Sequence, residues 1–197
     1  NLYHAASIGH AEAIIKSGSV VGISQNSESA QKTLGKGSTQ EAAVIRKGLV
    51  SGEKVVIILG DGRDKNRIQK RIDQKGLSDK FYFLGSYPSK KMPHYFACAD
   101  ALLISLKKAD IFSFTIPGKL QSYLACGKPI IGALDGIGKK IIEESNSGLC
   151  GNAENATDLA NNIFKLHDST KQTKEDYSKN AIKYFRTARV QLNKPSA

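Results

Sequence analysis

The segment Ile111-Phe-Ser-Phe-Thr-Ile-Pro-Gly-Lys-Leu-Gln-Ser-Tyr-Leu-Ala-Cys-Gly-Lys-Pro-Ile-Ile-Gly-Ala-Leu-Asp135 contains a loop, a helix and a strand in that order. Proline suits the first turn of a helix because its φ angle is fixed and it has no N–H group. Glycine commonly ends a helix in the left-handed conformation. Pro117 and Gly127 therefore predict a helix that runs from about Pro117 to Cys126.

The predicted start of this helix carries groups that bind phosphate. Backbone N–H groups without helical partners lie there together with the Thr115 hydroxyl, the approachable backbone of Gly118 and the Lys119 ammonium. A helix N-terminus with such neighbours attracts anions. An ordinary capped helix with a solvated lysine explains these residues equally well when they are considered alone.

Length and composition limit the class of protein. The chain has 197 residues, 40% hydrophobic and 24% charged, which is enough for one large domain with its own core. No apolar run approaches the roughly 20 residues that cross a bilayer, and no signal-peptide pattern opens the chain. We therefore expect a cytoplasmic protein, with peripheral attachment to the inner face of the membrane as an open alternative. Three cysteines without metal-ligand spacing predict reduced thiols and no metal site: Cys98, Cys126 and Cys150.

The charge balance is strongly basic. Lys and Arg number 29 against 18 Asp and Glu, which gives a net charge of +11. Such a charge fits a nucleic acid, an anionic membrane surface or a phosphorylated small ligand. Because we find neither a helix-turn-helix pattern nor aromatic residues interleaved with basic ones, we expect no nucleic-acid partner. The anionic membrane surface stays open as a partner.

Short apolar runs alternate with helical patterns along most of the chain. Parallel strands that are buried on both faces give such runs, so the fold class is α/β with a doubly wound parallel sheet. The predicted strands are Val55–Leu59, Phe81–Leu84, Ala101–Ile104, Pro129–Ala133 and Gly148–Cys150. We expect one domain over residues 34–186, preceded by a poorly legible segment, 1–33, and followed by a basic tail, 187–197.

The loops that follow the strands are the expected binding region, because ligands of open parallel sheets bind at the carboxyl ends of the strands. Glycines beside polar or basic groups let a backbone approach a flat or anionic ligand closely, and together these loops favour a nucleotide. Asp110 is the carboxylate that we nominate for contact with ligand hydroxyls. The three-glycine dinucleotide fingerprint is absent, so NAD is not expected. We expect four loops to share this edge: Lys107–Lys119, Leu134–Gly136, and two that supply the candidates Gly60, Asp61, Gly62 and Arg63 and the candidates Gly85, Ser86 and Tyr87.

Four strings carry a resemblance to a known family: Ile58-Leu-Gly-Asp-Gly62, Phe83-Leu-Gly85, Met92-Pro-His-Tyr-Phe-Ala-Cys-Ala-Asp100 and Thr115-Ile-Pro-Gly-Lys-Leu-Gln-Ser-Tyr-Leu-Ala-Cys-Gly-Lys-Pro-Ile130. Over about residues 34–186 the chain resembles the carboxyl-terminal half of a family 4 retaining glycosyltransferase with two Rossmann-like domains, the GT-B architecture. The last string is similar to the branch that includes bacterial N-acetyl-L-fucosamine transferases of O-antigen and capsule synthesis.

The resemblance implies roles for particular residues. This half would bind a nucleotide-sugar donor, and an amino-terminal half would bind the acceptor. Residues 85–87 would hold the base. Gly37 and Gln40 would contact the donor phosphates or the sugar. Phe114 and Ser122 stand where the family has two glutamates, the second of which binds the ribose; the Ser122 hydroxyl could take that role. The diphosphate would contact Thr115, Ile116, Pro117, Gly118 and Lys119.

We therefore expect a domain that binds a UDP-sugar and serves in surface polysaccharide assembly, that is lipopolysaccharide biosynthesis. Alone it should bind but not catalyse. No cofactor is expected, because the nucleotide-sugar is a substrate, and no catalytic side chain is assigned. The main alternative is a non-catalytic nucleotide-binding or basic interaction module on the same fold. A sugar-nucleotide epimerase would need an acid–base pair in the crevice, which we do not find.

Overall fold

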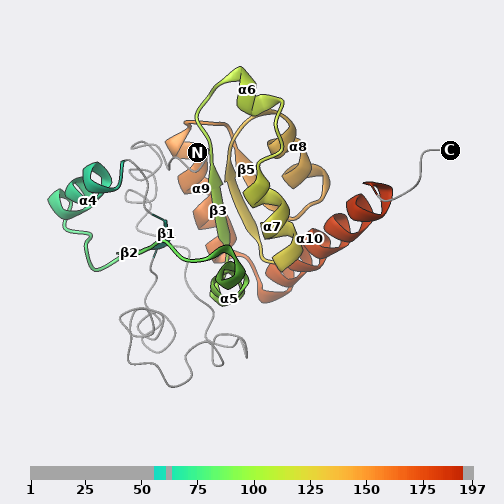
Figure 1. Ribbon diagram of the computed structural model, residues 1–197, viewed down its shortest axis with the longest axis horizontal. Helices are drawn as coiled ribbons and strands as arrows, with labels where there is room; N and C mark the ends of the chain where they lie inside the picture. Colours follow the sequence, from blue (N-terminus) through green and yellow to red (C-terminus); the bar gives the residue numbers. More distant parts are fainter. Residues whose placement is uncertain (1–55, 61–63, 193–197) are drawn as a thin grey trace.

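Residues 56–60 and 64–192 are described by the computed structural model, which shows an α/β fold with parallel sheets (Figure 1). Strand β1 (Val56–Leu59) pairs in parallel with β2 (Phe81–Gly85). Strand β4 (Ile130–Ala133) lies between β3 (Leu102–Ser105) and β5 (Gly148–Gly151), again in parallel. Each strand predicted from the sequence is thus present, and the predicted fold class is confirmed.

Helices connect the strands. Three features differ from the sequence expectation. The loop expected before Phe114 contains α6, which is too short to give a periodic pattern. The sequence predicts a helix start near Lys139, but α8 begins at Gly136. Helix α10 continues to Leu192, so the predicted basic tail 187–197 begins inside a helix. The helices are α4 (Lys65–Gln74), a 3-10 turn (Ser89–Lys91), α5 (Met92–Cys98), α6 (Asp110–Ser113), α7 (Gly118–Cys126), α8 (Gly136–Glu144), α9 (Ala156–Asp168) and α10 (Lys171–Leu192).

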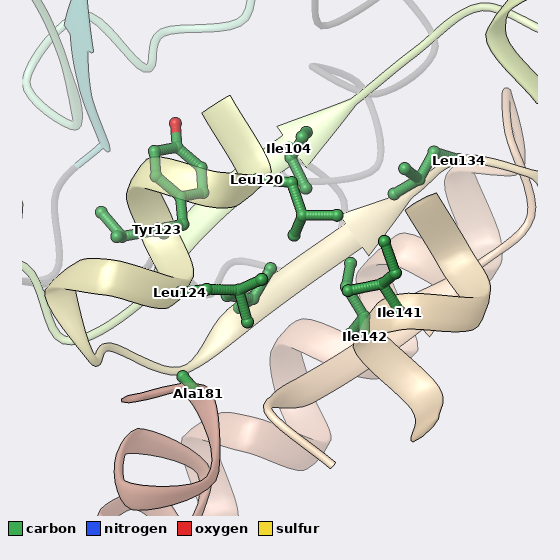
Figure 2. Packing of buried hydrophobic residues seen from close by; sticks show 10 residues of the cluster. Ile104, Leu120, Tyr123, Leu124, Leu134, Ile141, Ile142 and Ala181 are labelled. Carbon is green, nitrogen blue, oxygen red and sulfur yellow. The ribbon is translucent and has the colours of Figure 1, made fainter. Parts of the chain in front are cut away.

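One face of the β3–β4–β5 sheet is covered by α7, α8 and α10 (Figure 2). Leu102 and Ile104 of β3 point to this face, as does Ile130, which is opposite Leu102 in the register. Side chains alternate between the two faces of a strand, so every second residue is available to these helices. The cluster is completed from the helices by Leu120, Tyr123, Leu124, Ile141, Ile142 and Ala181.

The other face packs against α9. Ile131 and Ala133 of β4 are fully buried there, against Leu159 and Ile163 of α9. The same cluster includes Ile72 of α4 and Phe81 of β2, so the β1–β2 pair joins the core through side chains. Helices on both faces explain why the strand sequences are apolar throughout and do not alternate with polar residues.

Gly127 ends α7 with φ +62° and confirms the helix stop predicted from the sequence. The residue is buried against α10: a Cβ built on it would lie 2.5 Å from Ile182 Cδ1. The glycine therefore serves two purposes, since it accepts the left-handed conformation and leaves room for the neighbouring helix.

All three cysteines are free thiols. The sequence predicts buried thiols, which holds for Cys98, whereas Cys126 and Cys150 are half-buried. Burial raises the pKa of Cys150 to about 12, so its thiol stays protonated at neutral pH. In the described part of the chain, no helix combines the length and the apolar character needed to cross a membrane.

Replacing Gly127 by Ala should destabilise the fold more than replacing Gly76 by Ala. Both glycines have positive φ, +62° and +67°, so either variant carries similar backbone strain, about 1 kcal/mol. A Cβ at position 76 meets no atom within 4 Å, whereas one at position 127 meets Ile182. Urea unfolding should therefore show a further loss of about 1–3 kcal/mol for G127A. Equal losses would mean that α10 moves aside at no cost.

Candidate functional site

The N-terminus of α7 is open to solvent. Pro117 is its N-cap, with φ −63° and ψ 130°, and the helix begins at Gly118. The predicted helix is confirmed, although Pro117 precedes the first turn and does not form part of it. A Cβ on Gly118 would meet no atom within 4 Å, and both Gly118 and Lys119 are exposed. A small anion can therefore approach the first amide groups of the helix without displacing protein atoms.

The polar side chains around this N-terminus are partly engaged. Partial burial of the Lys119 ammonium lowers its pKa, although the residue as a whole is exposed. The Ser122 hydroxyl lies 3.4 Å from the Gly118 carbonyl, to which it donates. The Thr115 hydroxyl donates to the carbonyl of Ile111 at 2.7 Å and so closes the turn of α6. This differs from the sequence expectation, in which the Thr115 hydroxyl adds to the phosphate site.

Two glycines of α8 let the loop after β3 approach closely. Gly136 has φ +69°, and a Cβ there would overlap the backbone of Ser113. A Cβ on Gly138 would overlap Leu134 Cδ1 and would lie 3.3 Å from Pro117 Cδ. The start of α8 is thus held against both ends of the segment that leads into α7. The glycine at 136 was expected in a loop of the binding region, whereas the role of Gly138 was not foreseen; the Gly-x-Gly pattern at a helix start was its only signal.

The carboxylate of Asp135 connects the ends of two strands. It accepts a hydrogen bond from the backbone N–H of Ala153 at 3.0 Å. Asp135 is the N-cap of α8, but no side-chain hydrogen bond to the α8 backbone is formed. The bond instead ties the segment after β5 to the end of β4, so three strand ends are fixed relative to the N-terminus of α7.

A family model for glycosyl transferases group 1 matches residues 45–184. The chain belongs to this family. A 2-deoxystreptamine N-acetyl-D-glucosaminyltransferase from Streptomyces fradiae is 26% identical over 78 residues, which are 40% of this chain and 17% of that protein. All four strings that carry the sequence resemblance lie within residues 45–184.

Solved structures show the same fold. HepE from Anabaena, in complex with UDP and glucose, superposes with a TM-score of 0.57 at 16% identity, over 99% of this chain and 54% of HepE. The C-terminal domain of the group 1 glycosyl transferase LpcC from Francisella tularensis gives 0.59 at 16% identity, over 95% of each chain. The chain therefore spans about half the length of HepE and nearly all of that domain.

In this group 1 glycosyltransferase domain, two further glycines meet at the ends of β1 and β2 and form the Gly60–Gly85 corner. The Gly60 N–H donates to the Gly85 carbonyl at 2.7 Å, and both residues have positive φ, +128° and +77°. Ser86 is exposed, and the Tyr87 ring packs on Tyr95 with centroids 5.1 Å apart. The structure thus joins two of the loops that the sequence placed together.

This corner is not joined to the N-terminus of α7. Figure 1 shows α6 at one end of β3 and α5, which follows β2, at the other end. Within the described strands, β1 and β3 do not pair with each other, so no shared sheet aligns their carboxyl ends. The expectation that all the loops share one edge is therefore confirmed for the segments around α7 and α8 alone. Gly37, Gln40, Asp61, Gly62 and Arg63 lie outside the described residues.

Two aspartates flank β3 in the chain and differ in their surroundings. Asp110 is exposed and begins α6, in the segment that leads into α7. Asp100 lies before β3, at the opposite end of that strand, and burial raises its pKa to about 6 against the opposing effect of Lys128 and Lys174. The carboxyl group with the most perturbed pKa is thus away from the candidate site. Among residues 56–60 and 64–192, no cluster of metal-ligand side chains is present.

Replacing Asp100 by Asn should make stability less dependent on pH. The folded protein binds this proton more tightly than the unfolded chain, in which aspartate titrates near 3.8. The stability that Asp100 contributes is therefore present below about 3.8 and lost as the pH rises through about 6. D100N should be more stable than the parent at pH 8, by about 1 kcal/mol or less because solvent reaches the side chain, and the difference should vanish near pH 4. If urea unfolding gave the same stability difference between D100N and the parent at every pH from 4 to 8, the raised pKa of Asp100 would be contradicted.

Proposed function

We propose that this chain is the donor-binding half of a retaining glycosyltransferase and that it holds the diphosphate of a UDP-sugar at the N-terminus of α7. The observation that carries the proposal is the open helix start, where the exposed Gly118 and Lys119 follow directly on Pro117. Backbone amides at such a position point toward an anion, and the helix dipole favours negative charge there.

The same groups account for catalysis without a protein nucleophile. When the bond between sugar and diphosphate breaks, negative charge grows on the departing phosphate oxygen. Amide groups fixed by the helix and the Lys119 ammonium stabilise that charge more in the transition state than in the ground state. Because α8 and the loop after β3 hold the helix start in place, these donors need little reorganisation during the reaction.

Family membership supports glycosyl transfer, and the UDP in the HepE complex supports a UDP-sugar as the donor. The acceptor would bind to a second half, as the length of HepE relative to this chain suggests. We place the enzyme in surface polysaccharide assembly on the strength of the string Thr115–Ile130, and N-acetyl-L-fucosamine is the sugar that this string favours. The Gly60–Gly85 corner with Ser86 and Tyr87 is proposed to hold the base.

Calorimetric titration with UDP tests the diphosphate site. Lys119→Ala should weaken binding by about 1–3 kcal/mol, the range expected for a charge-assisted hydrogen bond. Lys165→Ala is the control, because Lys165 is also exposed but belongs to α9, on the other face of the sheet. It removes the same charge and should leave the affinity unchanged. No heat with millimolar UDP, or equal losses in the two variants, would refute the proposal.

The residue at position 122 should determine how strongly the ribose is recognised. Ser122 offers a neutral hydroxyl, already directed at the Gly118 carbonyl, where a carboxylate would accept from ribose hydroxyls. We therefore expect the parent to bind UDP and 2′-deoxy-UDP with similar affinity. Ser122→Glu should favour UDP by about tenfold, the scale of one charge-assisted hydrogen bond, and Ser122→Gln, of equal size but neutral, should favour it less. A strong preference of the parent for UDP would show that other groups bind the ribose.

A further inference from the structure

Exposed apolar side chains lie directly before the N-terminus of α7 and at the start of α8. Phe114 is 80% exposed, Ile116 42% and Ile137 39%, and we call these three the apolar shelf. Ile111 is exposed as well, but it lies in α6, further from the start of α7 along the chain. A single exposed apolar residue is ordinary, but a group of them marks a contact surface.

Close approaches between two segments hold the shelf in place. The chain before α7 meets the start of α8 twice, where the Ser113 backbone lies against Gly136 and where Pro117 lies close to Gly138. In the sequence, each residue of the shelf stands between the two members of its own segment that make these contacts. The position of the shelf relative to the N-terminus of α7 is therefore fixed.

The shelf adjoins the place where we propose that the diphosphate binds. Gly118 begins α7, two positions after Ile116 and four after Phe114. An extended chain spans at most about 3.5 Å per residue, so these two residues have Cα atoms within about 7 and 14 Å of that of Gly118. The sugar of a sugar nucleotide is bonded directly to the second phosphate. A diphosphate held at the start of α7 therefore brings the sugar ring within reach of the shelf.

The side chains of the shelf offer no hydrogen bond to a sugar hydroxyl. Thr115, which stands between Phe114 and Ile116, donates its hydroxyl hydrogen to the Ile111 carbonyl at 2.7 Å. A hydroxymethyl group placed against the shelf would lose hydrogen bonds to water, whereas a methyl group would gain by leaving water. An acetamido group fits less well than a methyl group, because its N–H and carbonyl also need partners.

We infer, on the basis of the proposed function, that the apolar shelf contacts the C5 methyl group of a 6-deoxyhexose donor and that Phe114 determines this specificity. Phe114 has the largest exposed fraction of the three residues, and its ring presents the most apolar area. N-acetyl-L-fucosamine, the sugar that the sequence resemblance favours, carries such a methyl group. Closure of a second half would also cover the shelf, but the contact with the donor forms in this chain alone and can be measured there.

Calorimetric titration of the 197-residue chain with matched UDP-sugars tests the selection. Two pairs differ only in a methyl or a hydroxymethyl group at C5: UDP-N-acetyl-L-fucosamine with UDP-N-acetyl-L-galactosamine, and UDP-N-acetylquinovosamine with UDP-N-acetylglucosamine. The methyl sugar should bind about three- to tenfold more tightly in at least one pair, the scale expected for one apolar group in a partly open site.

Variants of Phe114 test which residue makes the selection. Phe114→Gln should abolish the preference by weakening the binding of the methyl sugar, and Phe114→Leu, which stays apolar, should keep most of it. The change should appear with the sugar nucleotides and be absent with UDP, which has no sugar. Phe164→Gln is the control, because Phe164 is exposed on α9, and it should bind every ligand like the parent. Urea midpoints equal to that of the parent would establish that the variants are folded.

Titration with UDP alone separates this contact from the diphosphate site. If UDP does not bind, the diphosphate site is refuted and the contact with the sugar falls with it. If UDP binds but neither pair shows a preference for the methyl sugar, the contact with a 6-deoxyhexose is overturned and the diphosphate site stands. A preference that persists in Phe114→Gln would overturn the role of Phe114. Phe114 variants that bind every UDP-sugar like the parent would indicate that the shelf contacts the second half and not the donor.

Discussion

Burial of both faces of the β3–β4–β5 sheet is the constraint on which the rest of the structure depends. Ile130 and Ile131 are adjacent in β4 and fully buried, one beneath α7 and α8 and the other beneath α9. Neither face can turn toward water without exposing apolar area, at roughly 25 cal/mol for each Å². Helices must therefore cover both faces. Because α7 and α8 each connect one parallel strand to the next, each begins at the carboxyl end of the strand before it.

The position of α7 follows from that burial. Leu120 and Leu124 are one turn apart and both reach the core, which orients the helix on the sheet. Tyr123 adds an edge-to-face contact with Phe96 at 5.1 Å between ring centroids and donates to the Leu103 carbonyl at 3.4 Å. With its body held in this way, the helix directs its open N-terminus to the carboxyl end of β3, where an anion benefits from the helix dipole.

Glycines decide how closely the surrounding segments approach this N-terminus. The backbone contact between Ser113 and Gly136 leaves no room for a side chain. The same contact braces the short helix α6 and the loop that leads from it into α7.

The sequence predicted every described strand, the bounds of α7 and its left-handed stop at Gly127, because these depend on local periodicity and on residues with restricted or unusual φ angles. It also located the open helix start at Gly118 and Lys119. Local pattern did not reveal α6, or that the Thr115 hydroxyl donates to the Ile111 carbonyl.

By itself, then, the sequence determined which segments are strands and helices and which group of residues makes an anion site. The tertiary structure alone decided which loops meet. It brought Gly136 against Ser113 and joined Gly60 to Gly85, but did not join that pair to α7. The physical reason is that propensity and periodicity act between residues close in the chain, whereas the meeting of distant loops depends on how whole strands pair and on the space left between them.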